Sequence, residues 1–247
     1  MRETLQNYLL AERSGMTVEH RPEDKPFVGE TLDGLLNAAA LLAEYFDLHG
    51  RFPLVRAILT PNRSEFDRCI ADVLGIKIEV PSNPVRVAQP QRTDLVLLSP
   101  QAYDATVSHY SPAAYERLIL HEVTHIVEES LSPNIEAVPR WWSEGLAIHL
   151  SGQWEEDMAE VLRETRAGKI PGMADMRDGA ITDHSVRLCY VWGWTAVRYV
   201  ETAFGRIAVR RVVEECADGD VLAILGQELA AFEQRWKEWL TSFSENR

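Results

Sequence analysis

The stretch from residue 111 to residue 130 constrains the fold of this chain more than any other segment. Ser111 and Pro112 have the residue types preferred at the N-cap and the first position of a helix, and apolar residues recur at helical spacing after them. One stripe of the predicted helix carries His121 and His125. Apolar side chains cover much of its remaining surface: Tyr115, Ile119, Ile126 and Val127. We therefore predict a helix that is buried on several sides and turns polar groups into the protein.

The two histidines belong to the pentapeptide HEVTH. Residues four apart share one face of a helix, so His121 and His125 can hold one zinc ion at Zn–N distances of about 2.0–2.1 Å. Glu122 is displaced sideways, where it reaches a water molecule on the metal and can act as a general base. An HExxH pattern arises by chance in roughly 2% of chains of this composition, and the alternative is a pair of surface histidines. The apolar surroundings favour the metal site, because buried polar groups need partners.

A catalytic zinc site needs a third protein ligand and leaves one position to water. The metzincin arrangement would place glycine at position 128 and histidine at position 131, where this chain has Glu128 and Leu131. The other arrangement takes a glutamate from the next helix, and the segment 139–150 (PRWWSEGLAIHL) offers Glu144. The intervening segment, 126–143, is long enough to finish one helix, turn and return antiparallel.

This pattern resembles that of the gluzincin zinc peptidases, the group with thermolysin-like and aminopeptidase N-like members. Their signature is HExxH-x18-E, with the last glutamate in a W-x-x-E-G context, which matches His121, Glu122, His125 and Glu144 here. The resemblance implies one zinc ion held by the two histidines and Glu144, with Glu122 as the catalytic base. The neighbours of Glu144 also match the usual surroundings: Trp141, Trp142, Gly145, Leu146 and Ala147.

A second segment, YVWG, resembles the Tyr-x-x-Gly segment that opens a later helix in aminopeptidase N-like enzymes. Tyr190 and Gly193 stand at the matching positions. The resemblance implies that the Tyr190 hydroxyl is catalytic and stabilises the oxyanion of the transition state, whereas the alternative makes Tyr190 a core aromatic residue. The GxMEN segment of those enzymes, whose glutamate holds a free amino group, has no counterpart before His121, so the resemblance does not extend to aminopeptidase specificity.

Other polar residues have two open interpretations each. His184 would be a second oxyanion donor by resemblance to thermolysin-like enzymes, or a surface histidine at a helix start. His149 and His109 would line the cleft, or be packed or exposed. Four carboxylates could accept a hydrogen bond from a metal-bound histidine, and the sequence does not choose among them: Glu128, Glu129, Asp175 and Asp183.

Patterns along the whole chain predict an α+β fold. The N-terminal segment 1–110 mixes predicted strands with helices, and a proline-rich loop or ragged edge covers 81–93. The predicted strands are 16–20, 53–60, 76–80 and 94–100, and the predicted helices there are 30–48 and 64–74. The rest of the chain is almost all helical, with helices at 140–151, 154–167 and about 184–204, and two or three more.

We expect residues 1–247 to form a single thermolysin-like catalytic domain. It would consist of a sheet-bearing N-terminal lobe (1–110), an active-site helix (111–131) and a helical C-terminal lobe (132–247), with the zinc site between the lobes.

Composition excludes some classes of partner. The net charge is −13, with 38 acidic against 25 basic residues, so we expect binding to neither nucleic acid nor membranes. Three cysteines without a CxxC pair predict buried thiols in a reducing compartment. The N-terminus lacks the apolar core of a signal peptide, and no segment approaches the about 18 apolar residues of a membrane span. We therefore expect a cytoplasmic protein.

The function predicted from these patterns is a zinc-dependent metallopeptidase that acts on a peptide or protein substrate. A zinc-stabilised binding or regulatory protein with little turnover is the alternative from another class, and hydrolysis of a non-peptide amide would use the same residues. The sequence leaves open the substrate, endo- against exo-cleavage and the oligomeric state.

Overall fold

The computed structural model describes residues 4–104, 110–176 and 183–245, and the side chains of residues 183–186 lie outside that description. The chain divides into two compact units, Met1–Ser130 and Leu131–Arg247, and each is described by itself. Together they give an α+β protein, as the sequence predicts.

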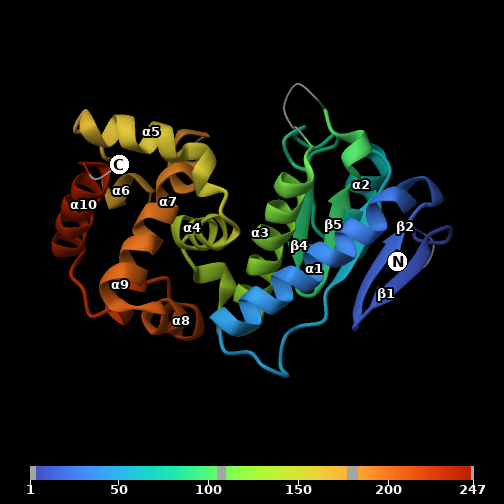
Figure 1. Cartoon of the computed structure of the whole chain (residues 1–247), viewed down its shortest axis with the longest axis horizontal. Coiled ribbons are helices and arrows are strands. Elements are labelled where there is room, and N and C mark those ends of the chain that lie inside the picture. The colour runs from blue at the N-terminus through green and yellow to red at the C-terminus, as the bar shows by residue number, and fades with distance from the viewer. Residues whose placement is uncertain (1–3, 105–109, 177–182, 246–247) are drawn as a thin grey trace. The chain divides into compact units, whose positions relative to one another are not determined.

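The first unit is built on a five-stranded mixed sheet with the order β1-β2-β3-β5-β4 (Figure 1). β2, β3 and β5 are parallel, and the edge strands β1 and β4 pair antiparallel with their neighbours. Ser14 and Gly15 both have positive φ (51° and 83°) and close the β1–β2 hairpin, as a two-residue turn of the type I′ kind requires. The strand bounds are Leu9–Arg13, Met16–His20, Arg56–Thr60, Ala88–Gln91 and Asp94–Leu98 for β1 to β5.

Helices cover the sheet and fix the position of the HExxH segment. The helices of this unit are α1 (Lys25–Tyr45), α2 (Arg63–Cys69, continued by a π-helical turn to Leu74) and α3 (Pro112–Leu131). α1 lies in contact with β2, whereas α2 packs against β3 and β5. Ile58, Val96 and Leu98 face α2. The central strands β3 and β5 carry buried apolar residues on both faces, as expected for strands of a sheet whose two faces are covered.

α3 is held against α1 by close contacts. A Cβ atom on Gly34 would lie 2.7 Å from Cδ1 of Ile119, so the glycine lets the two helices approach. The Thr31 and Tyr115 hydroxyls are 2.9 Å apart, and Asn37 donates a 2.7 Å hydrogen bond to Glu116. These contacts fix the helix that carries both histidines.

The described residues of the second unit form helices and connecting loops, and α7 contacts most of the other helices (Figure 1). Trp236 donates a hydrogen bond of 3.0 Å to Thr195 in the buried core between α10 and α7. The bounds are Arg140–Ser151 (α4), Trp154–Arg166 (α5), Met173–Met176 (α6), Asp183–Phe204 (α7), Arg206–Glu215 (α8), Val221–Ile224 (α9) and Leu229–Glu245 (α10).

The structure corrects one of the predicted strands and places an edge strand in the stretch predicted as a loop or ragged edge. Residues 76–80 form no strand: Ile76 and Ile78 pack on the cluster around Phe66 and Ile70 instead of pairing with a neighbour. β4 lies within 81–93, the stretch predicted as a loop or ragged edge. Its Pro90 is tolerated because β4 is an edge strand, where one side needs no backbone donor.

Among the described residues, no helix combines the length and the apolar character that crossing a membrane requires.

Candidate metal centre

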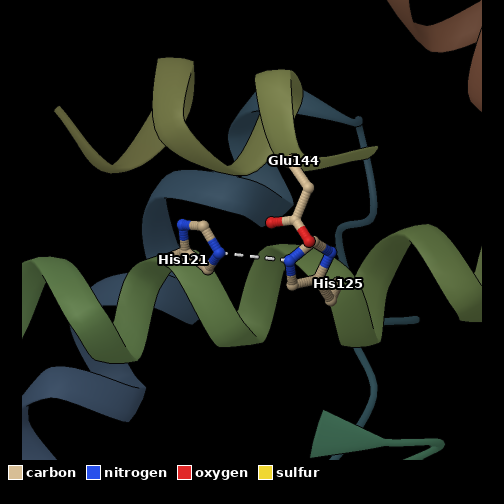
Figure 2. A group of neighbouring side chains, drawn as sticks. All are labelled: His121, His125 and Glu144. Atoms are coloured by element: carbon tan, nitrogen blue, oxygen red, sulfur yellow. Dashed lines mark hydrogen bonds between the residues drawn. The ribbon is translucent and has the colours of Figure 1, made fainter. Parts of the chain in front are cut away.

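The two histidines lie one helical turn apart on α3. His121 is buried and His125 half-buried, and their Nε2 atoms are 3.2 Å apart, the contact dashed in Figure 2. Two nitrogen ligands of one tetrahedral zinc ion, each about 2.0–2.1 Å from the metal, lie roughly 3.3 Å from each other. The spacing of the two imidazoles therefore fits ligation of a single ion.

The other ring nitrogen of His125 faces a carboxylate of the same helix. His125 Nδ1 lies 3.7 Å from Oε2 of Glu128, whose side chain is 1% exposed. A carboxylate at the second nitrogen of a ligating histidine orients the ring. Among the predicted acceptors whose side chains the structure describes, Glu128 is the one that lies beside a candidate ligand.

The other predicted acceptors have different surroundings. Glu129 accepts a 2.6 Å hydrogen bond from the Arg92 amide, and Asp175 accepts one of 2.7 Å from the Gly172 amide. The side chain of Asp183 lies outside the described residues.

Glu144 and Tyr190 meet inside the second unit. Glu144 lies on α4 and Tyr190 on α7, and the Tyr190 hydroxyl donates a 2.7 Å hydrogen bond to Oε1 of Glu144. The sequence predicts this hydroxyl near a substrate oxyanion. In the structure it holds the candidate third ligand.

Two glycines bring α4 and α7 together at this point. A Cβ atom on Gly145 would lie 2.5 Å from the carbonyl carbon of Gly193, and one on Gly193 would collide with the carbonyl oxygen of Trp141. The backbones therefore touch where any side chain would separate them. Because Glu144 precedes Gly145 and Tyr190 lies one turn before Gly193, this contact sets the distance between carboxylate and hydroxyl.

His121, His125 and Glu144 form a group that could hold a metal ion (Figure 2). One ligand atom of each lies within 4.8 Å of the others. Two imidazole nitrogens and a carboxylate oxygen suit Zn²⁺, and the same set of donors serves Fe²⁺ in oxygenases. The residues thus fit a divalent metal ion, and this donor set suits both Zn²⁺ and Fe²⁺.

Glu122 is buried beside His121 on α3, 9% exposed. One residue along a helix turns the side chain by about 100°, so Glu122 and His121 point in different directions. That separation is what a general base beside a ligand requires.

Tyr103 is a neighbour of Glu122 that the sequence analysis missed. It follows the short 3₁₀ helix after β5, and its buried hydroxyl has no hydrogen-bond partner among the described residues. Burial raises the pKa of Tyr103, and the charge of Glu122 raises it further. The phenol therefore stays protonated near neutral pH. No pattern marks Tyr103 in the sequence, because its interaction with Glu122 is tertiary.

His149 is packed inside the second unit, which is one of the two interpretations given for it above. Its Nε2 lies 2.7 Å from Oε2 of Glu201 on α7, and its side chain is 11% exposed. Glu201 was not singled out by the sequence. His109 and the side chain of His184 lie outside the described residues, so their two interpretations stay open.

The sequence matches no protein-family model, and a comparison with curated proteins finds no match.

Proposed function

We propose that this chain is a zinc-dependent metallopeptidase of the gluzincin type, folded as one thermolysin-like catalytic domain. The observation that carries the proposal is the grouping of His121, His125 and Glu144 within 4.8 Å, with Glu122 buried next to the first of them. A structural zinc site is closed by four protein ligands, whereas three protein ligands leave one position to water. The additional buried carboxylate at the position of a general base favours hydrolysis over a structural site.

Each residue has a separate role in the proposed reaction. His121, His125 and Glu144 would hold one Zn²⁺ ion, which supplies a Lewis acid that polarises the scissile carbonyl and lowers the pKa of water to about 7. Glu122 takes a proton from the attacking water while the water oxygen forms a bond to the carbonyl carbon. Glu122 then gives that proton to the leaving nitrogen as the C–N bond breaks. Tyr190 donates a hydrogen bond to the oxyanion.

The proposed setting is the cytoplasm. Cys69, Cys189 and Cys216 are all buried free thiols, which suits a reducing compartment. The proposed partner is a peptide or protein substrate, and the net charge of −13 favours neither nucleic acid nor an anionic membrane.

The deciding experiment compares Glu122→Gln with the unmodified chain. Glutamine cannot accept the proton but leaves the three ligands intact, so we expect one zinc ion per chain in both proteins. We expect kcat on a peptide library to fall by about 10² to 10⁴ in the variant. Zinc content is measured by elemental analysis, and cleavage by mass spectrometry.

Glu116→Gln is the matched control, because Glu116 is exposed on the same helix and its hydrogen bond from Asn37 can be kept by glutamine. Full peptidase activity in Glu122→Gln would contradict the mechanism. Zinc binding without cleavage by the unmodified chain would instead favour the alternative, a zinc-binding regulatory module with little turnover.

A further inference from the structure

The hydroxyl of Tyr190 has one proton and two prospective acceptors. It donates to Oε1 of Glu144 over 2.7 Å, and the proposed function gives it a second task at the substrate. A phenol has a single donor hydrogen, so it cannot serve both acceptors at once. Before substrate binds, the acceptor is the third metal ligand.

We propose that Tyr190 is a positioning residue for metal binding, which holds the Glu144 carboxylate in the orientation that a metal ion requires. This inference rests on the proposed zinc site, and it adds a role that precedes the chemical step. A hydrogen bond to a carboxylate is charge-assisted and directional. It therefore restricts a side chain that would otherwise turn about several single bonds.

The surrounding structure makes this hydrogen bond a fixed feature of the helix pair. At the Gly145–Gly193 contact the backbones of α4 and α7 touch, and a Cβ atom on either glycine would clash with the other helix. Farther along the same two helices, His149 and Glu201 form a second polar link of 2.7 Å. The links lie at different positions along the pair, so α4 cannot rotate against α7 without breaking at least one.

One oxygen of the carboxylate accepts from Tyr190, and a carboxylate has two oxygens. The tyrosine can therefore orient Glu144 through one oxygen while the second serves an ion as ligand. Partners that orient a metal ligand in this way typically change metal affinity by about 10–100-fold when they are removed.

The test measures Zn²⁺ affinity without any substrate. The unmodified chain, Tyr190→Phe and Tyr199→Phe compete for Zn²⁺ with a chromophoric chelator. We expect the Kd for Zn²⁺ to rise about tenfold or more in Tyr190→Phe. Tyr199→Phe is the matched control, because Tyr199 also lies on α7 but its ring packs against Phe204 and Phe232. We expect its Kd to be unchanged.

A second measurement reports on the hydroxyl itself. Zn²⁺ bound to Glu144 should change the ultraviolet absorption of Tyr190, whose hydroxyl donates a hydrogen bond to that carboxylate. We expect the difference spectrum between the zinc-loaded and the zinc-free protein to lose this tyrosine signal in Tyr190→Phe. Circular dichroism checks that the variant is folded, as expected for a residue that is 36% exposed.

The outcomes separate the two proposals. Equal Zn²⁺ affinity in Tyr190→Phe and the unmodified chain would overturn the positioning role and leave the metallopeptidase proposal standing. Failure of the unmodified chain to bind Zn²⁺ would overturn the proposed function, and the positioning role with it. Because no substrate is present, an inactive enzyme does not affect the result.

Discussion

At the scale of single residues, Asp24 shows what burial does to a charge in this fold. Its side chain is fully buried at the start of α1 and accepts a 2.7 Å hydrogen bond from Gln101. Burial raises the pKa of Asp24 above its ordinary value of 3.8. Hydrogen bonding from Ser99 and Gln101 lowers the pKa of Asp24 but does not offset the loss of water around the carboxylate.

The raised pKa makes a prediction about stability. Between the unfolded and the folded pKa, the folded state binds more protons, so the contribution of Asp24 to stability falls as pH rises through that window. We expect Asp24→Asn to raise the free energy of unfolding at pH 7, with the difference vanishing below the unfolded pKa. Urea unfolding at a series of pH values measures this. A variant less stable than the unmodified chain at pH 7 would contradict it.

The grouping of the candidate metal ligands could be predicted from the sequence because their spacing is local. HExxH spans little more than one helical turn, and Glu144 stands on the next helix along the chain, so motif and helical period suffice. The hydrogen bond from Tyr190 to Glu144 and the influence of Glu122 on Tyr103 could not be predicted. Both depend on how separate elements pack, which no short pattern encodes.

At the scale of elements, helices were predicted better than strands. The predicted helix 140–151 coincides with α4, and 184–204 differs from α7 by one residue, because glycine and proline mark helix ends. A strand depends on a partner that lies elsewhere in the chain. IKIEV alternates like a strand but buries its isoleucines against the Phe66 cluster, whereas AQPQ has little strand propensity and pairs with β5.

The contact between α4 and α7 gives a prediction at this scale. Gly193→Ala places a methyl group against the Trp141 carbonyl oxygen, and overpacking of this kind costs about 1–3 kcal/mol. We expect that loss in the free energy of unfolding, together with weaker Zn²⁺ binding as Glu144 and Tyr190 move apart. Denaturant unfolding and chelator competition measure the two effects.

Gly29→Ala is the control for this substitution. Gly29 also lies in a helix, but a Cβ atom there would meet nothing within 4 Å. We expect a gain of about 0.5–1 kcal/mol, because alanine is favoured over glycine in helices. Equal effects of the two substitutions would show that the crossing is not tightly packed.

At the scale of the whole molecule, the chain divides after Ser130, so α3 belongs to the first unit. The sequence predicts 111–131 as a segment of its own, because the motif is local whereas the packing of this helix is not encoded in any short pattern. The contacts of α3 with α1 through Gly34 and Thr31 explain the grouping.

Metal binding should stabilise the whole chain. A ligand that binds only the folded state at 100 times its Kd adds about 2.7 kcal/mol, which corresponds to a rise in Tm of roughly 5–10 °C for a chain of this size. We expect this shift on adding Zn²⁺ and its reversal by a chelator, measured by calorimetry. His125→Ala should abolish the shift. An equal Tm of the unmodified chain with and without Zn²⁺ would contradict the proposed site.

The glycine contact between α4 and α7 also fixes a helical phase. Each residue along a helix turns the next side chain by about 100°, so the offset from Tyr190 to Gly193 determines the direction of the hydroxyl. The step from Glu144 to Gly145 does the same for the carboxylate. The two helices meet through the backbones of Gly145 and Gly193. No side chain at the contact can therefore change the directions in which the hydroxyl and the carboxylate point. One residue inserted into either offset would turn its polar group away from the other while leaving the helices in contact.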